Sequence, residues 1–307
     1  MTRSPAPRIA LEPAGTRSWL ADAIIEGGGE IVRATDAEAV VWAVPTGRDD
    51  LRALLDANPG IRWVQLPWAG VEPFEGIFDH DHIWTSGKGV YAEPVAEHIL
   101  TLALAGLRGL GAYASATSWL APQGHNLLGA NVVILGAGGI CNSLLRLLGP
   151  FGCDITVVRK RAIAVDGAHR TIALDELDGA LATADLVVIA LALTPETTGL
   201  FDRRRLSAML PTAWLVNLGR GAHIVTDDLV DVLREGLIGG AAIDVTDPEP
   251  LPDGHPLWTE ERCLITPHVG NTPEMARPLL GARVAGNVAR FARGEALVGL
   301  VDPDLGY

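Results

Sequence analysis

The chain has 307 residues, 48% of them hydrophobic, and a formal net charge of −13. This length suggests one or two domains and is ample for a sizeable core. The acidic balance argues against non-specific binding to nucleic acid, which requires a basic surface. No apolar run approaches the ~20 residues of a membrane helix, and the N-terminal stretch MTRSPAPRIALEPAG lacks the apolar region of a signal peptide.

Three cysteines are present, at positions 141, 153 and 263. An odd number without a pairing pattern is typical of reduced thiols in the cytosol, so we expect a cytoplasmic protein. No CxxC pair and no cluster of cysteine and histidine occurs in the sequence. We therefore expect no metal site.

The first part of the chain alternates short apolar runs with helical patterns. Strands are predicted at 8–13, 39–44 and 62–67, and helices at 18–28 and 48–60. This alternation predicts parallel strands joined by helical crossovers. A long helix, 93–110, follows; it is apolar on most faces, which indicates burial between domains or subunits.

The strand and helix rhythm restarts at Asn131 and predicts a second open parallel sheet of about six strands. The expected strands are NVVIL, ITVVR, DLVVIAL, AWLVNL, GAAIDV and CLITP. Helical stretches lie between them, for example 226–236, for which Thr226 is a candidate N-cap. A C-terminal helix is predicted at 273–295, and we expect the tail after it to return to the first domain.

A glycine-rich turn lies between the first strand of the second sheet and the helix that follows. It reads Gly136-Ala137-Gly138-Gly139-Ile140-Cys141, which is GxGxx followed by cysteine. Gly136 allows the tight turn, and Gly138 lets the backbone approach a pyrophosphate at the helix N-terminus. Cys141 is small enough for the third glycine position of the GxGxxG motif. The turn therefore predicts a dinucleotide site that includes Gly139 and Ile140.

The residue at the end of the next strand indicates which dinucleotide binds. Enzymes that use NAD usually place Asp or Glu there, on the ribose 2′-hydroxyl. Here the stretch VVRKR places Arg159, Lys160 and Arg161 at that position, and no carboxylate. Cations suit a 2′-phosphate by charge and, for arginine, by fork geometry. We expect a preference for NADP(H), with NAD(H) possible; the alternative is a basic surface turn without a ligand.

Three further polar residues follow strands of the second sheet. Arg220 follows one strand, Glu249 lies in the loop after Asp244, and His268 follows the last strand. Loops after the strands of an open parallel sheet converge on the cofactor crevice. These side chains can therefore meet, although 29 and 19 residues separate Arg220, Glu249 and His268 along the chain.

These stretches resemble the D-isomer-specific 2-hydroxyacid dehydrogenase family, and the resemblance covers almost the whole chain. The motifs that carry it are the glycine loop, GVYAEPVAEH, LTPETTGL, NLGRG, IDVTDPEPLP, HPLW, TPHVG and the closing GY. The resemblance implies an α/β fold of two Rossmann-like, doubly wound parallel-sheet domains. The first, flavodoxin-like domain would comprise 1–96 and 276–307, completed by the C-terminus, and the NAD(P)-binding domain 97–275.

The resemblance also implies roles for the polar residues. Arg220 would hold the substrate carboxylate and polarise the 2-oxo group, because a guanidinium offers two parallel donors. His268 would donate a proton to the carbonyl oxygen, and Glu249 would hydrogen-bond His268 and favour its imidazolium. Asp244 would lie near the nicotinamide amide. The cofactor site that we expect also includes Leu191 and Leu218.

The stretch QLPWAGVE matches the substrate loop of the family. Backbone N–H groups around Ala69, Gly70 and Val71 would meet the substrate carboxylate. Trp68 is a candidate wall of the pocket or, alternatively, a core residue.

Several single residues keep two interpretations. Lys88 is expected to face either the cleft or solvent. Trp119 is expected either to pack locally or to contribute to the pocket of a partner subunit, as in some members of the family. His98 is expected to pack within its helix, and His80 and His82 to form a turn and no metal site. The family resemblance implies a homodimer formed through 93–125.

The function that we expect is NADPH-preferring reduction of a small 2-oxo acid, of the glyoxylate/hydroxypyruvate type, to a D-2-hydroxy acid. One alternative is another branch of the family, acting on a phosphoglycerate or phenylpyruvate type of substrate. Formate-type members resemble the chain less, since they carry Gln where Glu249 stands. A second alternative is a dinucleotide-sensing binding module.

Overall fold

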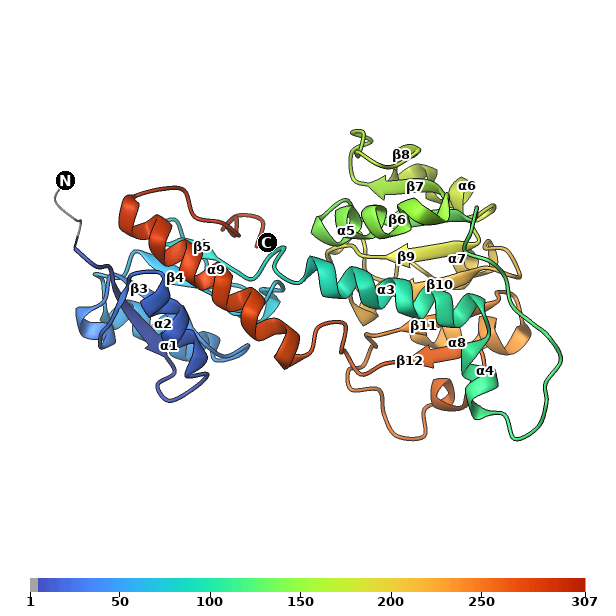
Figure 1. The fold of residues 1–307 in the computed structure, drawn as a ribbon, viewed down its shortest axis with the longest axis horizontal. Helices are drawn as coiled ribbons and strands as arrows, with labels where there is room; N and C mark the ends of the chain where they lie inside the picture. Colours follow the sequence, from blue (N-terminus) through green and yellow to red (C-terminus); the bar gives the residue numbers. More distant parts are fainter. Residues whose placement is uncertain (1–4, 307) are drawn as a thin grey trace. The chain divides into compact units, whose positions relative to one another are not determined.

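The protein is described by a computed structural model that covers residues 5–306 (Figure 1). Tyr307 of the closing motif and the first four residues of the N-terminal stretch lie outside this range. The chain divides into two compact units. Unit 1 comprises Met1–Tyr91 and Thr272–Tyr307, and unit 2 comprises Ala92–Asn271.

Unit 1 is built around a five-stranded sheet in the order β2-β1-β3-β4-β5, in which every pairing is parallel. This is the flavodoxin-like order, which right-handed helical crossovers produce. The strands are β1 (Arg8–Glu12), β2 (Glu30–Ile31), β3 (Ala39–Trp42), β4 (Trp63–Gln65) and β5 (Ile83–Thr85). The helices are α1 (Trp19–Glu26), α2 (Arg48–Ala57) and the C-terminal α9 (Pro273–Arg293).

The C-terminal segment completes unit 1. Helix α9 packs on α1, and Leu300 forms an antiparallel bridge with Thr85 at the edge of the sheet. Asn287 of α9 donates a hydrogen bond of 3.0 Å to the side-chain oxygen of Gln65, which also accepts one from Thr85. All three side chains are buried. A satisfied buried network of this kind fixes the helix on one position of the sheet.

Unit 2 contains a seven-stranded parallel sheet in the order β12-β11-β10-β9-β6-β7-β8. Counted from its own first strand, the order is the Rossmann pattern 3-2-1-4-5-6 with one strand added at the end. The strands are β6 (Asn131–Leu135), β7 (Asp154–Arg159), β8 (Arg170–Ala173), β9 (Leu186–Ile189), β10 (Trp214–Asn217), β11 (Gly240–Ile243) and β12 (Cys263–Ile265). The helices are α3 (Ala92–Leu107), α4 (Leu110–Ser115), α5 (Gly139–Leu148), α6 (Leu177–Leu181), α7 (Arg203–Ser207) and α8 (Thr226–Glu235).

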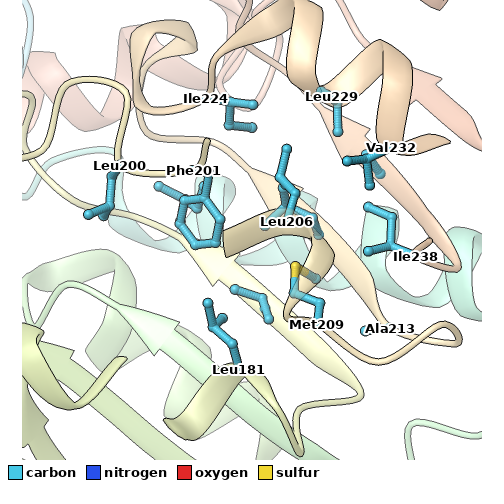
Figure 2. Close-up of a cluster of buried hydrophobic side chains, with 14 of the residues drawn as sticks. Leu181, Leu200, Phe201, Leu206, Met209, Ala213, Ile224, Leu229, Val232 and Ile238 are labelled. Carbon is cyan, nitrogen blue, oxygen red and sulfur yellow. The ribbon is translucent and has the colours of Figure 1, made fainter. Parts of the chain in front are cut away.

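The core of unit 2 explains why its central strands are continuous apolar runs. Helices cover both faces of the sheet, so the residues of β9, β10 and β11 are buried without alternation. Figure 2 shows one face, where Leu206 from α7 and Met209, just after this helix, meet Leu229 and Val232 from α8 over the sheet. This packing fixes the strands whose ends carry the polar residues of the site.

The structure differs from the sequence-based expectation in a few elements. The edge strands β2, β5 and β8 are short and were not predicted. The predicted helix 93–110 is divided in two, because Gly109 has a left-handed backbone with φ 63° and separates α3 from α4.

Thr226 is not an N-cap. It is the first residue of α8, Val225 occupies the N-cap position, and the Thr226 hydroxyl donates to the carbonyl of Asp247 at 2.6 Å.

Among the described helices, none has the length and apolar character needed to cross a membrane.

Candidate active site

The glycine loop begins where β6 ends. Gly136 has φ 110°, and a Cβ atom at this position would lie 2.4 Å from the carbonyl oxygen of Ala190, so only glycine fits. Gly138 is the N-cap residue of α5, and a Cβ atom there would meet nothing within 4 Å. The space over Gly138 is therefore open, and the first amides of α5 border it. Cys141, at the third glycine position of the motif, is buried in the first turn of α5, as expected for a small residue that packs between helix and sheet.

This loop fits the pyrophosphate of a dinucleotide. Gly138 and Gly139 are exposed, so their backbone is accessible to a ligand. The N-terminus of a ten-residue helix offers free N–H groups and a positive dipole end to an anion. A Cβ atom built at Gly138 would meet nothing within 4 Å, so the backbone there is open to the approach of a ligand.

The basic residues stand at the carboxyl end of β7, next to the glycine loop in the sheet. Arg159 is the last residue of the strand and is half-buried, whereas Lys160 and Arg161 are exposed. One guanidinium nitrogen of Arg159 donates to the carbonyl of Ile163 at 3.2 Å. Within residues 5–306, none of the three cations forms an ion pair. Lys160 interacts electrostatically with the exposed carboxylate of Glu196, so its charge is partly compensated.

The other expected cofactor residues lie at the same edge of the sheet. Leu191 follows β9, Leu218 follows β10 and Asp244 follows β11. The backbone of Leu191 borders Gly136, and the side chain of Leu218 borders Gly270. All of these positions are at carboxyl ends of parallel strands, where ligands bind in doubly wound sheets.

Asp244 is buried and collects hydrogen bonds from the segment that carries His268. Its Oδ1 accepts from the Thr266 hydroxyl at 2.6 Å and from the Val269 amide at 2.8 Å, and its Oδ2 accepts from the Gly270 amide at 2.9 Å. Burial alone would raise the pKa of Asp244, but these bonds and the neighbouring His98 outweigh it and lower the pKa to about 2. Asp244 is therefore ionised and holds the 266–270 segment in place.

Arg220 sits in a tight turn directly after β10. The side-chain oxygen of the buried Asn217 accepts from the Gly219 amide, and its nitrogen donates to the Arg220 carbonyl at 2.9 Å. The Arg220 amide donates to Nδ1 of the buried His223 at 3.1 Å, and the guanidinium donates to the Gly219 carbonyl at 2.8 Å. These bonds fix the backbone from which the Arg220 side chain extends.

His268 and Glu249 form a direct pair. Nδ1 of His268 lies 2.7 Å from Oε1 of Glu249, and both side chains are about half exposed. Because Nδ1 faces the carboxylate, Nε2 is the nitrogen left for another partner. The pair joins two loops, after β11 and β12, that are separated by 19 residues in the sequence.

The backbone of His268 has an unusual conformation. Its φ is 53°, in the left-handed region that residues other than glycine seldom adopt. The His268 amide donates to the carbonyl of Asp244 at 2.8 Å, which helps to hold this conformation. Strained backbone that the surroundings maintain in this way is characteristic of functional sites.

Supporting residues of the site were not singled out from the sequence. Asn217 and His223 fix the Arg220 turn, and Thr266 bridges Asp244 to His98, whose Nε2 lies 3.1 Å from the Thr266 hydroxyl and 3.5 Å from Asp244 Oδ1. His98 is thus more than the packing residue that we expected. The only available signal was that Asn217 and Thr266 are polar residues within the apolar strand runs.

The expected substrate loop lies in unit 1, after β4. Trp68 is half-buried and its ring lies 5.7 Å from that of the buried Tyr91, whose hydroxyl donates to the Pro67 carbonyl at 2.8 Å. Ala69 is exposed, Gly70 is half-buried and Val71 is buried. The structure therefore makes Trp68 a partly accessible residue rather than a core residue.

The remaining single residues are placed as follows. The side chains of Lys88 and Trp119 are exposed, Trp119 completely. His82 pairs with Asp79 and His80 with Asp304. No group of histidine, cysteine and acidic residues suited to a metal ion occurs in residues 5–306.

A hollow of about 690 Å³ lies at the opposite edge of the unit 2 sheet. It is lined at the starts of β10 and β12 by Trp214, Arg262 and Leu264, and also by Gly106 of α3 and by Gln123 from the segment after α4. This edge is remote from the carboxyl ends of the strands, so the hollow is not part of the candidate active site.

The chain is similar to known proteins of one family. The family model of the D-isomer specific 2-hydroxyacid dehydrogenase NAD binding domain matches residues 100–270. An uncharacterized protein in the proB 3′ region of Corynebacterium melassecola is 39% identical over 295 residues, 93% of this chain and 95% of its own. The glyoxylate reductase/hydroxypyruvate reductase of Homo sapiens is 35% identical over 187 residues, 59% of this chain and 56% of its own length.

Solved structures share the fold over nearly the whole chain. The crystal structure of a D-isomer specific 2-hydroxyacid dehydrogenase from Xanthobacter autotrophicus Py2, in complex with NADPH and MES, has a TM-score of 0.83. It is 24% identical, and the match covers 98% of this chain and 100% of that one. At this identity the likeness establishes the fold.

The fold and the glycine loop define an oxidoreductase that uses a nicotinamide dinucleotide. The chain belongs to the D-isomer-specific 2-hydroxyacid dehydrogenase family, whose members are NAD(P)-dependent D-2-hydroxyacid dehydrogenases.

Proposed function

We propose that this enzyme is an NADPH-preferring reductase of small 2-oxo acids, of the glyoxylate/hydroxypyruvate type, and that it forms D-2-hydroxy acids. The observation that carries the proposal is the 2.7 Å pair of His268 and Glu249, at the sheet edge where Arg220 also lies. The human relative is a glyoxylate reductase/hydroxypyruvate reductase, although the matched region spans only 56% of its length.

Arg220 binds the 2-oxo acid in this proposal. A guanidinium presents parallel donors that match a carboxylate and also polarise the neighbouring carbonyl oxygen. The turn held by Asn217 and His223 supports this role, because it restricts the backbone from which Arg220 extends. Backbone N–H groups of Ala69, Gly70 and Val71 complete the binding of the substrate carboxylate, with Trp68 beside them.

His268 is the proton donor. With Nδ1 held by Glu249, the protonated ring directs its Nε2–H towards the carbonyl oxygen. When bound, the reduced nicotinamide supplies the hydride that adds to C2 of the substrate. The electron pair of the broken C=O π bond then takes the proton from His268, which regains one from solvent. Glu249 stabilises the charged ring before transfer and fixes its orientation throughout.

The preference for NADPH rests on the end of β7. Arg159 and the two cations after it form no ion pair with a described residue, although Lys160 interacts electrostatically with Glu196. A 2′-phosphate is therefore the ligand that their charge and position favour. Hydrogen bonds to charged groups are each worth roughly 1.5–3 kcal/mol. Two such contacts would favour NADPH over NADH by about 100-fold or more.

A homodimer is the assembly that we propose, formed through 93–125. Exposed apolar side chains at and just beyond this segment support it: Leu110 is 56%, Trp119 100% and Leu128 65% exposed. Large apolar side chains that are exposed in one chain are common at protein interfaces. Light scattering coupled to size exclusion tests this assembly directly, with a mass near 65 kDa expected and a mass near 32 kDa contradicting it.

Initial rates of NADPH and NADH oxidation test the proposed function. The panel of substrates is glyoxylate, hydroxypyruvate, pyruvate and phenylpyruvate. We expect turnover of at least one small 2-oxo acid, with a higher kcat/KM for NADPH. Turnover of phenylpyruvate alone would place the enzyme in another branch of the family. Binding of NADP without any turnover would favour a dinucleotide-sensing module.

A further inference from the structure

Arg17 is a half-buried cation of unit 1 without an acidic partner. It lies in the loop between β1 and α1, and its guanidinium carbon stands 4.9 Å from the centre of the Trp68 ring. Burial lowers the pKa of Arg17, and within residues 5–306 no carboxylate counteracts this effect. A guanidinium that loses water contacts without gaining an anion is costly to keep in a fold.

Most other arginines of unit 1 are paired or hydrogen-bonded. The ion pairs are Arg8 and Arg62 with Glu38, Arg33 with Asp36, Arg48 with Asp49, Arg52 with Asp56, and Arg290 and Arg293 with Glu295. Arg283 donates instead to the carbonyls of Ser86 and Lys88, both at 3.1 Å. Arg17 differs from these residues because its described contact is the face of an indole.

The backbone of Arg17 is also held in an unfavourable conformation. Its φ is 45°, and among the described residues the only other non-glycine with positive φ is His268. The left-handed region costs a residue with a Cβ roughly 1 kcal/mol or more. One of these two outliers is the proposed proton donor, and the other places a guanidinium next to the substrate loop.

The position of the guanidinium connects it to that loop. Trp68, on which Arg17 stacks, directly precedes Ala69, and the Tyr91 hydroxyl fixes the Pro67 carbonyl just before it. Both Arg17 and Arg283 influence the phenol of Tyr91 electrostatically, so this end of the loop is positive. An anionic group of a ligand beside Trp68 could contact the guanidinium of Arg17 and the plane of the indole ring.

We propose that Arg17 binds a second anionic group of the substrate, a carboxylate or a phosphate distal to the 2-oxo acid. This inference rests on the proposed function, in which the 2-oxo acid's own carboxylate already has Arg220 and the loop amides as partners. A further cation beside the same loop therefore raises kcat/KM for small 2-oxo acids that carry a second anionic group, in addition to the monoanions that the proposed reductase accepts.

The test compares matched substrates on wild type, Arg17→Met and Arg17→Lys. The pairs are pyruvate with oxaloacetate, and hydroxypyruvate with phosphohydroxypyruvate, so that carboxylate and phosphate are distinguished. Loss of one charged hydrogen-bonding partner lowers the ratio of kcat/KM for dianion over monoanion by about 10- to 100-fold in Arg17→Met. We expect the loss mainly in KM, and partial recovery in Arg17→Lys, which keeps the charge without the fork.

Arg33→Met is the matched control, since Arg33 is an exposed arginine of the same unit, paired with Asp36. It should leave the dianion-to-monoanion ratio unchanged. If wild type reduces monoanions but Arg17→Met does not change the ratio in either pair, the anion site is refuted while the proposed reductase stands.

A binding measurement separates the two proposals if no 2-oxo acid is reduced. Malonate and acetate are then titrated calorimetrically into wild type and Arg17→Met. Tighter binding of malonate to wild type than to the variant upholds the anion site without the reductase. Equal binding to both proteins, or none to wild type, overturns the anion site.

Discussion

Nδ1 of His268 lies 2.7 Å from Oε1 of Glu249, although the two residues come from the loops after β11 and β12. The contact gives the imidazole a fixed orientation and leaves Nε2 free to act on a ligand. The backbone of His268 has φ 53°, and its amide donates a hydrogen bond to the carbonyl of Asp244. The carboxylate of Glu249 thus orients the imidazole of His268, whose backbone is strained. This arrangement suits a side chain that acts as a general acid.

Removing the imidazole should remove the proton donor. We expect His268→Ala to lower kcat at least 100-fold, because general acid catalysis contributes about 10²–10⁴. NADPH should still bind, since the glycine loop and Arg159 are on other strands. Stopped-flow rates together with a fluorescence titration of NADPH measure the two effects. A kcat within a few-fold of wild type would exclude His268 as the donor.

Glu249→Gln tests the orienting carboxylate separately. The amide keeps the shape but loses the charge that stabilises the protonated ring, so kcat should fall while KM changes little. Glu261→Gln is a matched control: Glu261 is an exposed acid of the same unit. An effect of Glu249→Gln confined to KM would indicate that the carboxylate acts on substrate binding instead.

The basic end of β7 should determine the choice of cofactor. Arg159→Asp places a carboxylate where NAD enzymes use one, and it repels a 2′-phosphate. We expect kcat/KM for NADPH to fall by about 10- to 100-fold and that for NADH to stay equal or rise. The ratio of the two values, measured with one 2-oxo acid, is the readout. An unchanged ratio would mean that Arg159 does not meet the phosphate.

Asp244 should contribute to stability in a pH-dependent way. Its pKa of about 2 in the folded protein lies below the ordinary value of 3.8, so its contribution is complete above pH ~4 and is lost as the pH falls towards 2. Asp244→Asn should therefore lower the free energy of unfolding by about 2 kcal/mol at pH 7, and by less at pH 3. Urea unfolding at both pH values, with the exposed Asp56→Asn as control, measures this; an equal loss at both would contradict it.

The contribution of His223 to stability should change at a higher pH than that of Asp244. Burial lowers the pKa of His223 below the ordinary 6.5, although hydrogen bonds to the Ala192 and Arg220 carbonyls oppose the shift. The neutral ring is therefore stabilising above pH ~6.5, and the contribution is lost as the pH falls below that value. His223→Gln should lose more stability relative to wild type at pH 8 than at pH 5. A difference that grows towards acid pH would refute a neutral buried ring.

Much of the fold was predictable because apolar runs and glycine turns are local signals. The central strands β6, β7, β9, β10 and β11 are buried on both sides, and their sequences are continuous apolar stretches. The edge strand β8, Arg170–Ala173, has a mixed sequence and is a strand only because β7 offers it a partner. Tertiary pairing decides such segments, and local sequence does not reveal it.

The site was predictable in part for a similar reason. Arg220, Glu249 and His268 follow recognisable strands, and family motifs carry them. Arg17 had no such signal: its contact with Trp68 spans 51 positions of sequence, and its left-handed backbone is not encoded by a glycine. The hydrogen bonds of Asn217 and His223 around Arg220 depend on the three-dimensional geometry of the turn, which has no local sequence signal.

The stereochemistry of the product tests the central claim most directly. Hydroxypyruvate is incubated with the enzyme and NADPH, and the glycerate formed is resolved by chiral chromatography. The account predicts D-glycerate, formed in equal amount to the NADPH consumed, because the chain belongs to the D-isomer-specific family. Formation of L-glycerate, or consumption of NADPH without glycerate, would contradict it.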